Sequence, residues 1–191
     1  RINYGLQWAL TDDIGNRSSV FFGQSYRLKD DSTFGKGSGL NDNLSDLVGK
    51  VQFSPNSHID LLYRTRLATD NLSPNRNEAQ FSATVPAYSV SGSYIFLNRQ
   101  EEGEFAGREE LNIVGSAKLT REWKSSLSAT RDLDAGEMRS ASMDFIYENE
   151  CVVFSSSLNR TFYEDRDIKP VDSINFILTL KTIGEVKTGF S

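Results

Sequence analysis

The sequence predicts an all-β protein, an antiparallel up-and-down transmembrane β-barrel segment, and three observations lead to that fold class. Apolar and polar side chains alternate along most of the chain, the alternating segments are long, and the connections between them are alternately short and long. Alternation is typical of a strand because successive side chains of a strand point to opposite faces. The spacing that would predict helices is not sustained anywhere in the chain.

The alternation gives each predicted strand one apolar face and one polar face. In residues 1–11, Leu6 and Trp8 share one face, whereas Gln7 and Thr11 lie on the other. About eleven segments show this pattern, and we expect them to form one open sheet on their own. Their spans are 1–11, 18–28, 46–54, 58–69, 77–85, 87–97, 109–120, 122–133, 138–148, 151–163 and 172–183.

The length of these segments favours a membrane barrel over a soluble sheet. Soluble strands average ~5–6 residues, whereas a tilted strand that crosses a membrane needs ~9–11 residues. Most of the segments reach the greater length, and their second faces carry Ser, Thr, Asn, Gln and Lys throughout, as a wet interior requires. No apolar run approaches the ~18 residues that a transmembrane helix needs.

The connections predict which end of the strands lies on which side of the membrane. Residues 54–57, 85–88, 120–123 and 148–151 form short turns. The connections between them are longer and charged, at 29–43, 69–77, 98–110, 132–138 and 163–172. Outer-membrane barrels have short periplasmic turns and longer external loops, so the pattern predicts the outer membrane of a Gram-negative bacterium.

Aromatic residues of the apolar face gather near the strand ends, which predicts two interfacial belts. Such belts flank the apolar band of membrane barrels, although aromatic residues also favour strands in general. The candidates near the short turns are Trp8, Phe53, Tyr88, Trp123 and Tyr147, and those near the long loops are Tyr26, Phe96 and Phe162.

Composition argues against several classes of function. The net charge of −5 disfavours a nucleic-acid partner, because phosphate binding needs a basic face. One cysteine and one histidine cannot complete a zinc site. His58 lies beside the short turn 54–57 with no pair of acidic residues near it in the sequence, so we expect no catalytic residue, no metal and no cofactor.

The stretch "YENECVVFSSSLNRTFYEDRDIKPVDSINFILTLKTIG", residues 147–184, resembles the end of the LptD family of outer-membrane proteins that assemble lipopolysaccharide. The shared features are a cysteine at a short turn, a basic strand, an acidic loop and a last strand of the form F-x-L-x-L-K-x-[IL]-G. Residues 1–146 carry only a generic barrel pattern. The resemblance implies that residues 1–191 form the C-terminal portion of a larger barrel, preceded by further strands and a periplasmic domain.

The resemblance also implies partners. These are lipopolysaccharide itself, an LptE-like plug lipoprotein in the lumen, a periplasmic bridge protein that docks on the absent domain, and the lipids of the outer membrane. The basic residues of the polar face are then expected either to be solvated and ion-paired or to contact phosphorylated lipid or the plug. They are Lys50, Arg64, Arg66, Lys118 and Lys124.

Cys151 has a role that only the resemblance suggests. In that family, cysteine at this turn pairs with cysteine in the periplasmic domain, often through two adjacent residues, whereas Val152 follows Cys151 here. The resemblance therefore implies one interdomain disulfide, with its partner outside this chain. The alternative is an unpaired small residue at the start of a strand.

The resemblance further implies that lipid leaves the barrel through a lateral opening beside the last strand. We expect residues 172–183 to form that strand and one edge of the opening. Its candidate residues are Ile174, Asn175, Phe176, Leu178, Thr179 and Leu180.

Two other classes share much of the pattern. A general outer-membrane porin or receptor would have the same strands and would need no cysteine at the turn. A soluble β-sandwich adhesin would have strands but no reason to place its long loops at one end.

Overall fold

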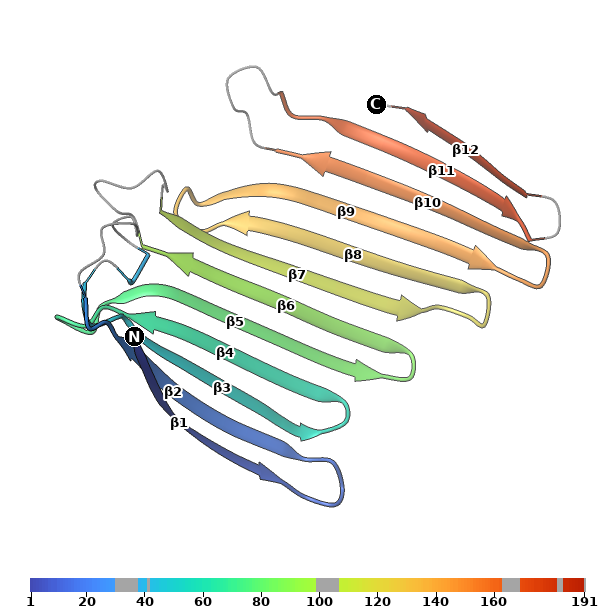
Figure 1. Ribbon diagram of the computed structural model, residues 1–191. Helices are drawn as coiled ribbons and strands as arrows, with labels where there is room; N and C mark the ends of the chain where they lie inside the picture. The colour runs from blue at the N-terminus through green and yellow to red at the C-terminus, as the bar shows by residue number, and fades with distance from the viewer. Residues whose placement is uncertain (30–37, 41, 99–106, 163–168, 182–183, 191) are drawn as a thin grey trace. The chain divides into compact units, whose positions relative to one another are not determined.

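The computed structural model describes residues 1–29, 38–40, 42–98, 107–162, 169–181 and 184–190, and it confirms the predicted all-β class (Figure 1). Twelve strands form one antiparallel sheet in chain order, each paired with its neighbour in the sequence. The strands are β1 (Ile2–Thr11), β2 (Arg17–Tyr26), β3 (Leu47–Asn56), β4 (Ile59–Leu67), β5 (Pro74–Val85), β6 (Tyr88–Leu97), β7 (Arg108–Lys118), β8 (Trp123–Asp132), β9 (Glu137–Glu148), β10 (Val152–Thr161), β11 (Asp172–Leu180) and β12 (Gly184–Phe190). Among the described residues, no helix is long and apolar enough to cross a membrane.

The strand β12 corrects two expectations. About eleven strands were predicted, and residues 172–183 were expected to form the last of them. Instead β11 ends at Leu180, and β12 pairs with β11 from Leu180 opposite Gly184 to Ile174 opposite Phe190. This strand was not predicted from the sequence because it is short and contains Gly184 and Gly189, and glycine is depleted in strands.

The alternation of short and long connections is confirmed in part. By the strand bounds, the connections after β1, β3, β5, β7, β9 and β11 are short, whereas those after β2, β6 and β10 are long. The connection after β4 was expected to be long, at 69–77, but it spans only residues 68–73 because β5 begins at Pro74. The connection 132–138 was expected to be long and is a tight turn of residues 133–136. Asp132 caps it by accepting a bond from the amide of Ala135 at 3.0 Å, and Gly136 supplies its positive φ of 71°.

The described residues divide into two compact units, 1–82 with 93–110 and 83–92 with 111–191. In the first unit, the register places Trp8 opposite Val20, and Val20 opposite Val51. Directly paired residues share a face in an antiparallel sheet, so the predicted apolar face is continuous across these strands. The polar face carries Gln52 and Lys50 at the alternate positions.

In the second unit, the same geometry builds rows that cross four strands. One row on the apolar face joins Leu127, Met143, Leu158 and Ile174. The next row toward the short turns joins Ser125, Phe145, Ser156 and Phe176, and the one after it joins Trp123, Tyr147, Phe154 and Leu178.

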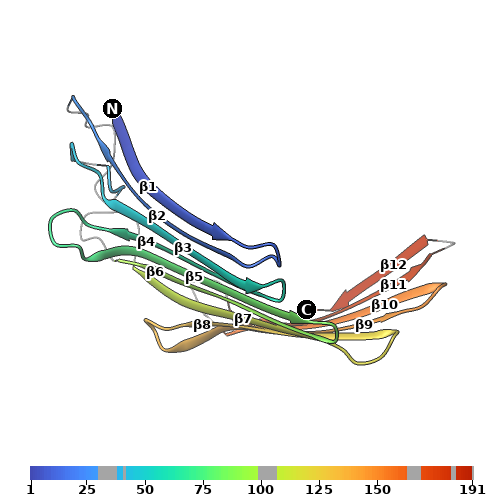
Figure 2. The ribbon, with the colours of Figure 1, turned by 90° about the horizontal axis from the view of Figure 1, so that it is seen from below.

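Neither face is covered by other described residues. Figure 2 shows the strands of each unit as a single layer, with no helix or second sheet packed on them. No hydrophobic residue among those described is buried, and Leu6 and Trp8 are 72% and 57% exposed. Soluble monomers rarely expose large continuous apolar patches, so this face requires an apolar environment, which argues against the soluble β-sandwich.

One aromatic side chain lies on the polar face and fills the space left by two glycines. Gly5 and Gly23 are directly opposite each other on β1 and β2. A Cβ on Gly23 would lie 2.7 Å from the Phe21 ring, and one on Gly5 would lie 3.1 Å from it. Phe21 therefore joins the first two strands by packing across both glycines.

Replacement of Gly23 by alanine is expected to displace the Phe21 ring and to lower the free energy of unfolding. A cross-strand side-chain contact contributes up to ~1 kcal/mol, so we expect a loss of about that size in denaturant unfolding of the full-length protein in detergent micelles. In a Phe21→Ala background the same change should cost nothing. Gly115→Ala is the matched control, because nothing lies within 4 Å of a Cβ there. An equal cost with and without Phe21 would contradict the packing.

Candidate functional site

The polar face of the second unit is rich in hydroxyl groups. The Asp144 carboxylate accepts hydrogen bonds from Ser126 at 3.2 Å and from Ser157, on the strands to either side. Ser128 and Ser142 are joined by a 2.7 Å hydrogen bond. These contacts bind β8, β9 and β10 together and leave a face that water can solvate.

The candidate gate residues divide between the two faces. Asn175 is paired with Ser157 and with Gly189, and Thr179 is paired with Val153, so both belong to the polar face. The other four belong to the apolar face, where the Phe154 and Phe176 rings stack with centroids 6.1 Å apart. Those four are Ile174, Phe176, Leu178 and Leu180. β11 lies between β10 and β12, and its residues from Ile174 to Leu180 pair with β12, so β11 is not the edge strand of the sheet.

The basic residues predicted for the polar face lie on it in the paired strands. Lys50 is directly opposite Arg64, and Arg64 lies 3.4 Å from the Glu78 carboxylate. Arg66 lies 3.3 Å from Asp46. These two ion pairs favour the interpretation that the basic side chains of the polar face are paired with carboxylates, rather than free to bind a ligand.

Glu148 organises the polar face at the short-turn end of the second unit. Its two carboxylate oxygens lie 3.3 Å from the Lys124 Nζ atom and 3.2 Å from the Lys181 Nζ atom. The three residues come from β8, from the end of β9 and from the turn after β11. Lys118 is the last residue of β7, so it lies at the same short-turn end of the strands. Its amide donates to the carbonyl of Ala87 at 2.8 Å.

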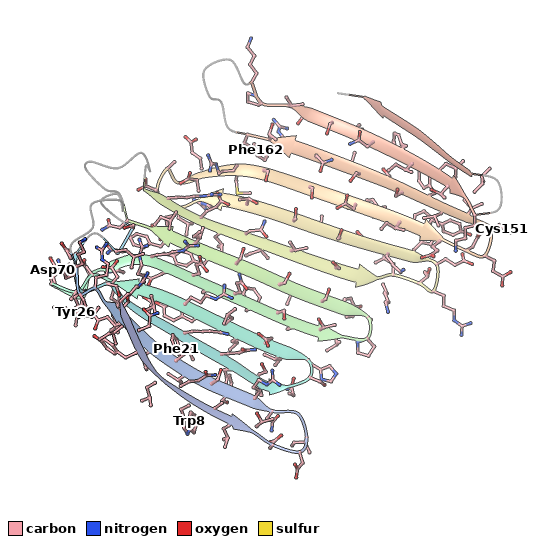
Figure 3. The ribbon with its side chains drawn as sticks, in the orientation of Figure 1. Trp8, Phe21, Tyr26, Asp70, Cys151 and Phe162 are labelled. Atoms are coloured by element: carbon pink, nitrogen blue, oxygen red, sulfur yellow. The ribbon has the colours of Figure 1, made fainter. Side chains whose placement is uncertain are left out.

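Cys151 lies in the turn between β9 and β10 and is exposed (Figure 3). The side chain of Asn149 shapes this turn by accepting bonds from the amides of Cys151 and Val152, at 2.9 and 2.8 Å. The carbonyl of Cys151 accepts the amide of Lys181 at 2.9 Å. Cys151 is therefore exposed on a turn that these hydrogen bonds connect to its neighbours.

The aromatic candidates lie at the strand ends, as their sequence positions indicate. Trp123 and Tyr147 are directly paired, with ring centroids 5.1 Å apart. Figure 3 shows Trp8 near the β1–β2 turn and Tyr26 at the opposite strand end. Phe53 lies opposite Leu61, Tyr88 opens β6, Phe96 lies near its other end, and Phe162 follows β10. That these residues form two interfacial belts remains a prediction.

A network at the long-loop end was missed by sequence reasoning. The buried Arg27 donates to the carbonyls of Leu40 and Asp42, the latter at 2.9 Å. Ser45 is also buried, and its hydroxyl accepts the amide of Ser25 at 2.8 Å. These bonds fasten the described part of the β2–β3 loop to the end of β2.

Asp46 ties the same loop to two further strands. Its carboxylate lies 3.3 Å from Arg66 of β4 and accepts a bond from Asn75 of β5 at 2.9 Å. Its amide donates to the carbonyl of Gly39 at 2.9 Å, and Gly39 has a φ of 71°. Arg66 also donates to the carbonyl of Ser38 at 3.1 Å. Since Arg66 belongs to the polar face, the loop is anchored on that face.

The described residues contain no group of three or more metal-ligating side chains. The acidic loop residues 163–168, which contributed to the family resemblance, lie outside the part of the chain that the structure describes.

Comparison with known proteins identifies one family. The family model LptD, described as LPS transport system D, matches residues 1–123. The match corrects the interpretation of residues 1–123 as a generic barrel pattern, because these residues carry the family signal. The stretch 147–184, on which the resemblance rested, lies outside the match. No curated protein matches the chain.

Substitution of Asp46 by alanine is expected to release the β2–β3 loop from β4 and β5. Hydrogen bonds to a charged group contribute ~1.5–3 kcal/mol, so amide hydrogen exchange in residues 42–46 should accelerate roughly tenfold or more in the full-length protein. Arg64→Ala is the matched control, because its ion pair is half exposed and such pairs contribute ~0–1 kcal/mol. Unchanged exchange in the Asp46 variant would show that the network does not hold the loop.

Proposed function

Because this chain belongs to the LptD family of outer-membrane lipopolysaccharide transport proteins, we propose that its polar face lines the route by which lipopolysaccharide reaches the outer leaflet. The observation that carries the proposal is the division of one sheet into an exposed apolar face and a hydroxyl-rich polar face. The apolar face suits lipid, and the polar face suits the sugars and phosphates of lipopolysaccharide.

The proposal extends to the rest of the translocon. Residues 1–191 would be the C-terminal portion of the barrel, with further strands and a periplasmic domain supplied by the remainder of the protein. An LptE-like lipoprotein would fill the lumen, and a periplasmic bridge protein would deliver lipid through the periplasmic domain. The work is transport, and the proposal assigns no enzymatic step to this chain.

We also propose that lipid leaves the barrel laterally beside the last strand of the sheet. The position of this exit differs from the one expected from the sequence. The edge on this side is formed by β12 and not by β11. A lateral opening would therefore separate β12 from the strand that closes the barrel. Asn175 and Thr179 of β11 would then lie one strand inward from the opening, on the polar face.

Cys151 is proposed to form a disulfide with the periplasmic domain. Its exposure at a short turn supports this role, since short turns of outer-membrane barrels face the periplasm and that compartment favours disulfides. Cys151→Ser in the full-length protein should abolish a reductant-sensitive mobility difference in non-reducing electrophoresis. Identical mobility of the unreduced wild type and the variant would refute the disulfide.

The central experiment is site-specific photo-crosslinking in cells. A photoreactive amino acid in place of Asn175 in the full-length protein should give an adduct that anti-lipopolysaccharide antibody detects, because Asn175 lies on the polar face beside Ser157. The adduct should disappear when export from the inner membrane is depleted. Probes at Thr179 and Lys118 test the same face.

A failure at all three positions would reject the proposed route. Ion conductance by the purified protein, together with that failure, would favour the general porin instead. A probe at Leu178, on the apolar face of the same strand, is the matched control for contact with membrane lipid.

A further inference from the structure

Lys50, on the polar face of the first unit, makes no ion pair or hydrogen bond with any residue that the structure describes. Ion pairing accounts for the two arginines of the neighbouring strand, since Arg64 pairs with Glu78 and Arg66 with Asp46. Lys50 is directly opposite Arg64 on the same face. Like charges in that arrangement destabilise a sheet, so an anion beside them would stabilise this pair.

Arg76 of β5 adds a third cation. Its Nε atom donates to the Glu78 carboxylate at 2.6 Å, and the same carboxylate lies 3.4 Å from Arg64. Because Arg64 belongs to the polar face, this contact places Glu78 and Arg76 on that face as well. One carboxylate therefore serves two guanidinium groups. Lys50, Arg64 and Arg76 are called the basic cluster from here on.

The charges that flank the basic cluster on this face do not neutralise it. They come in equal numbers of each sign, with Arg17 and Asp60 on either side of Ser54 toward the short turns, Arg66 and Asp46 toward the long loops, and Arg108 and Glu110 on β7. Among the described residues, the cluster therefore holds three cations against the single carboxylate of Glu78. Two positive charges remain in excess.

The cations of the cluster are more accessible than its carboxylate. The side chain of Glu78 is 16% exposed, whereas those of Arg64 and Arg76 are 48% and 50% exposed. A guanidinium group has five N–H donors, so the contacts with Glu78 leave others available. Guanidinium groups bind phosphate in a fork geometry, and an ammonium group adds a point charge. A phosphate monoester carries a charge of about −1.5 to −2 at neutral pH, which matches the excess of the cluster.

The second unit has no such cluster in the middle of its polar face. There the Asp144 carboxylate lies in one row with Ser126, Ser157 and Asn175. A carboxylate repels phosphate, whereas hydroxyl and amide groups bind the hydroxyl groups of sugars. The row through Asp144 therefore suits neutral sugar, and the excess positive charge of the first unit suits phosphate.

We propose that the basic cluster binds a phosphate group of lipopolysaccharide. The inference rests on the proposed function, because that function brings lipopolysaccharide to the polar face, and it names the residues that take the phosphate. Lys50 supplies the charge that has no partner among the described residues. Arg64 and Arg76 supply N–H donors, and Glu78 positions both guanidinium groups. Half-exposed cations bind weakly, which suits a substrate that has to leave the site again.

The test places a photoreactive amino acid at Gln52, which follows Lys50 by two positions on the same face. The adduct with lipopolysaccharide is measured in cells, in the full-length protein, relative to the Asn175 adduct of a parallel strain. It should fall roughly tenfold when a phosphatase that acts before export removes the phosphate groups, and likewise in Lys50→Gln. Lys50→Arg should retain most of the adduct, because it keeps the charge.

Arg17→Gln is the matched control, because it removes a cation from the same face beside Ser54 and outside the cluster. It should leave the Gln52 adduct unchanged. An equal loss in Arg17→Gln and Lys50→Gln would show a general positive field and overturn the inference. An adduct that does not depend on phosphate, or an adduct with phospholipid or protein in place of lipopolysaccharide, would overturn it as well.

The Asn175 probe separates this failure from failure of the proposed function. Labelling at Asn175 without phosphate-dependent labelling at Gln52 rejects the basic cluster alone. Absence of a lipopolysaccharide adduct at both positions rejects the transport route as well.

Discussion

The structure depends on one constraint, the backbone hydrogen bonds that each strand exchanges with its neighbours. In a bilayer no water is available to satisfy a free amide or carbonyl, so a spanning strand must be paired on both sides. The same pairing fixes the register, and a slip by one residue would turn every side chain to the other face. The pairing of Met143 with Leu127 and Leu158 therefore also determines that Asp144 meets Ser126 and Ser157 on the polar face.

Local alternation was enough to predict most of this arrangement. It assigned Trp8 to the apolar face and Asn175 to the polar face, because period two is a property of neighbouring residues. It could not find β12, whose glycines weaken the pattern, nor the short turn that Gly136 permits. The network around Asp46 could not be predicted either, since it joins residues of the β2–β3 loop, β4 and β5 whose proximity exists only after folding. The family signal in residues 1–123 was likewise not visible as a motif.

Small residues have opposite consequences on the two faces. On the polar face, Gly5 and Gly23 leave a gap that the Phe21 ring of the same sheet fills. On the apolar face, Gly115, Ala129 and Ala141 leave a gap that no described side chain fills, since they line an open groove. The first gap is filled by a side chain of the same sheet, Phe21. The second gap is open at the surface of the apolar face.

The unpaired sides of the sheet define what else the protein needs. One side of β1 and one side of β12 have no partner strand among the described residues, and an open edge cannot persist in hydrocarbon. In the proposed larger barrel, additional strands would pair with both edges, and the polar face would then line the lumen. β12 is short and contains two glycines, and glycine in the interior of a strand weakens it. A weakened edge strand would lower the cost of separating β12 from the strand that closes the proposed barrel, and this is the position at which lateral exit is proposed.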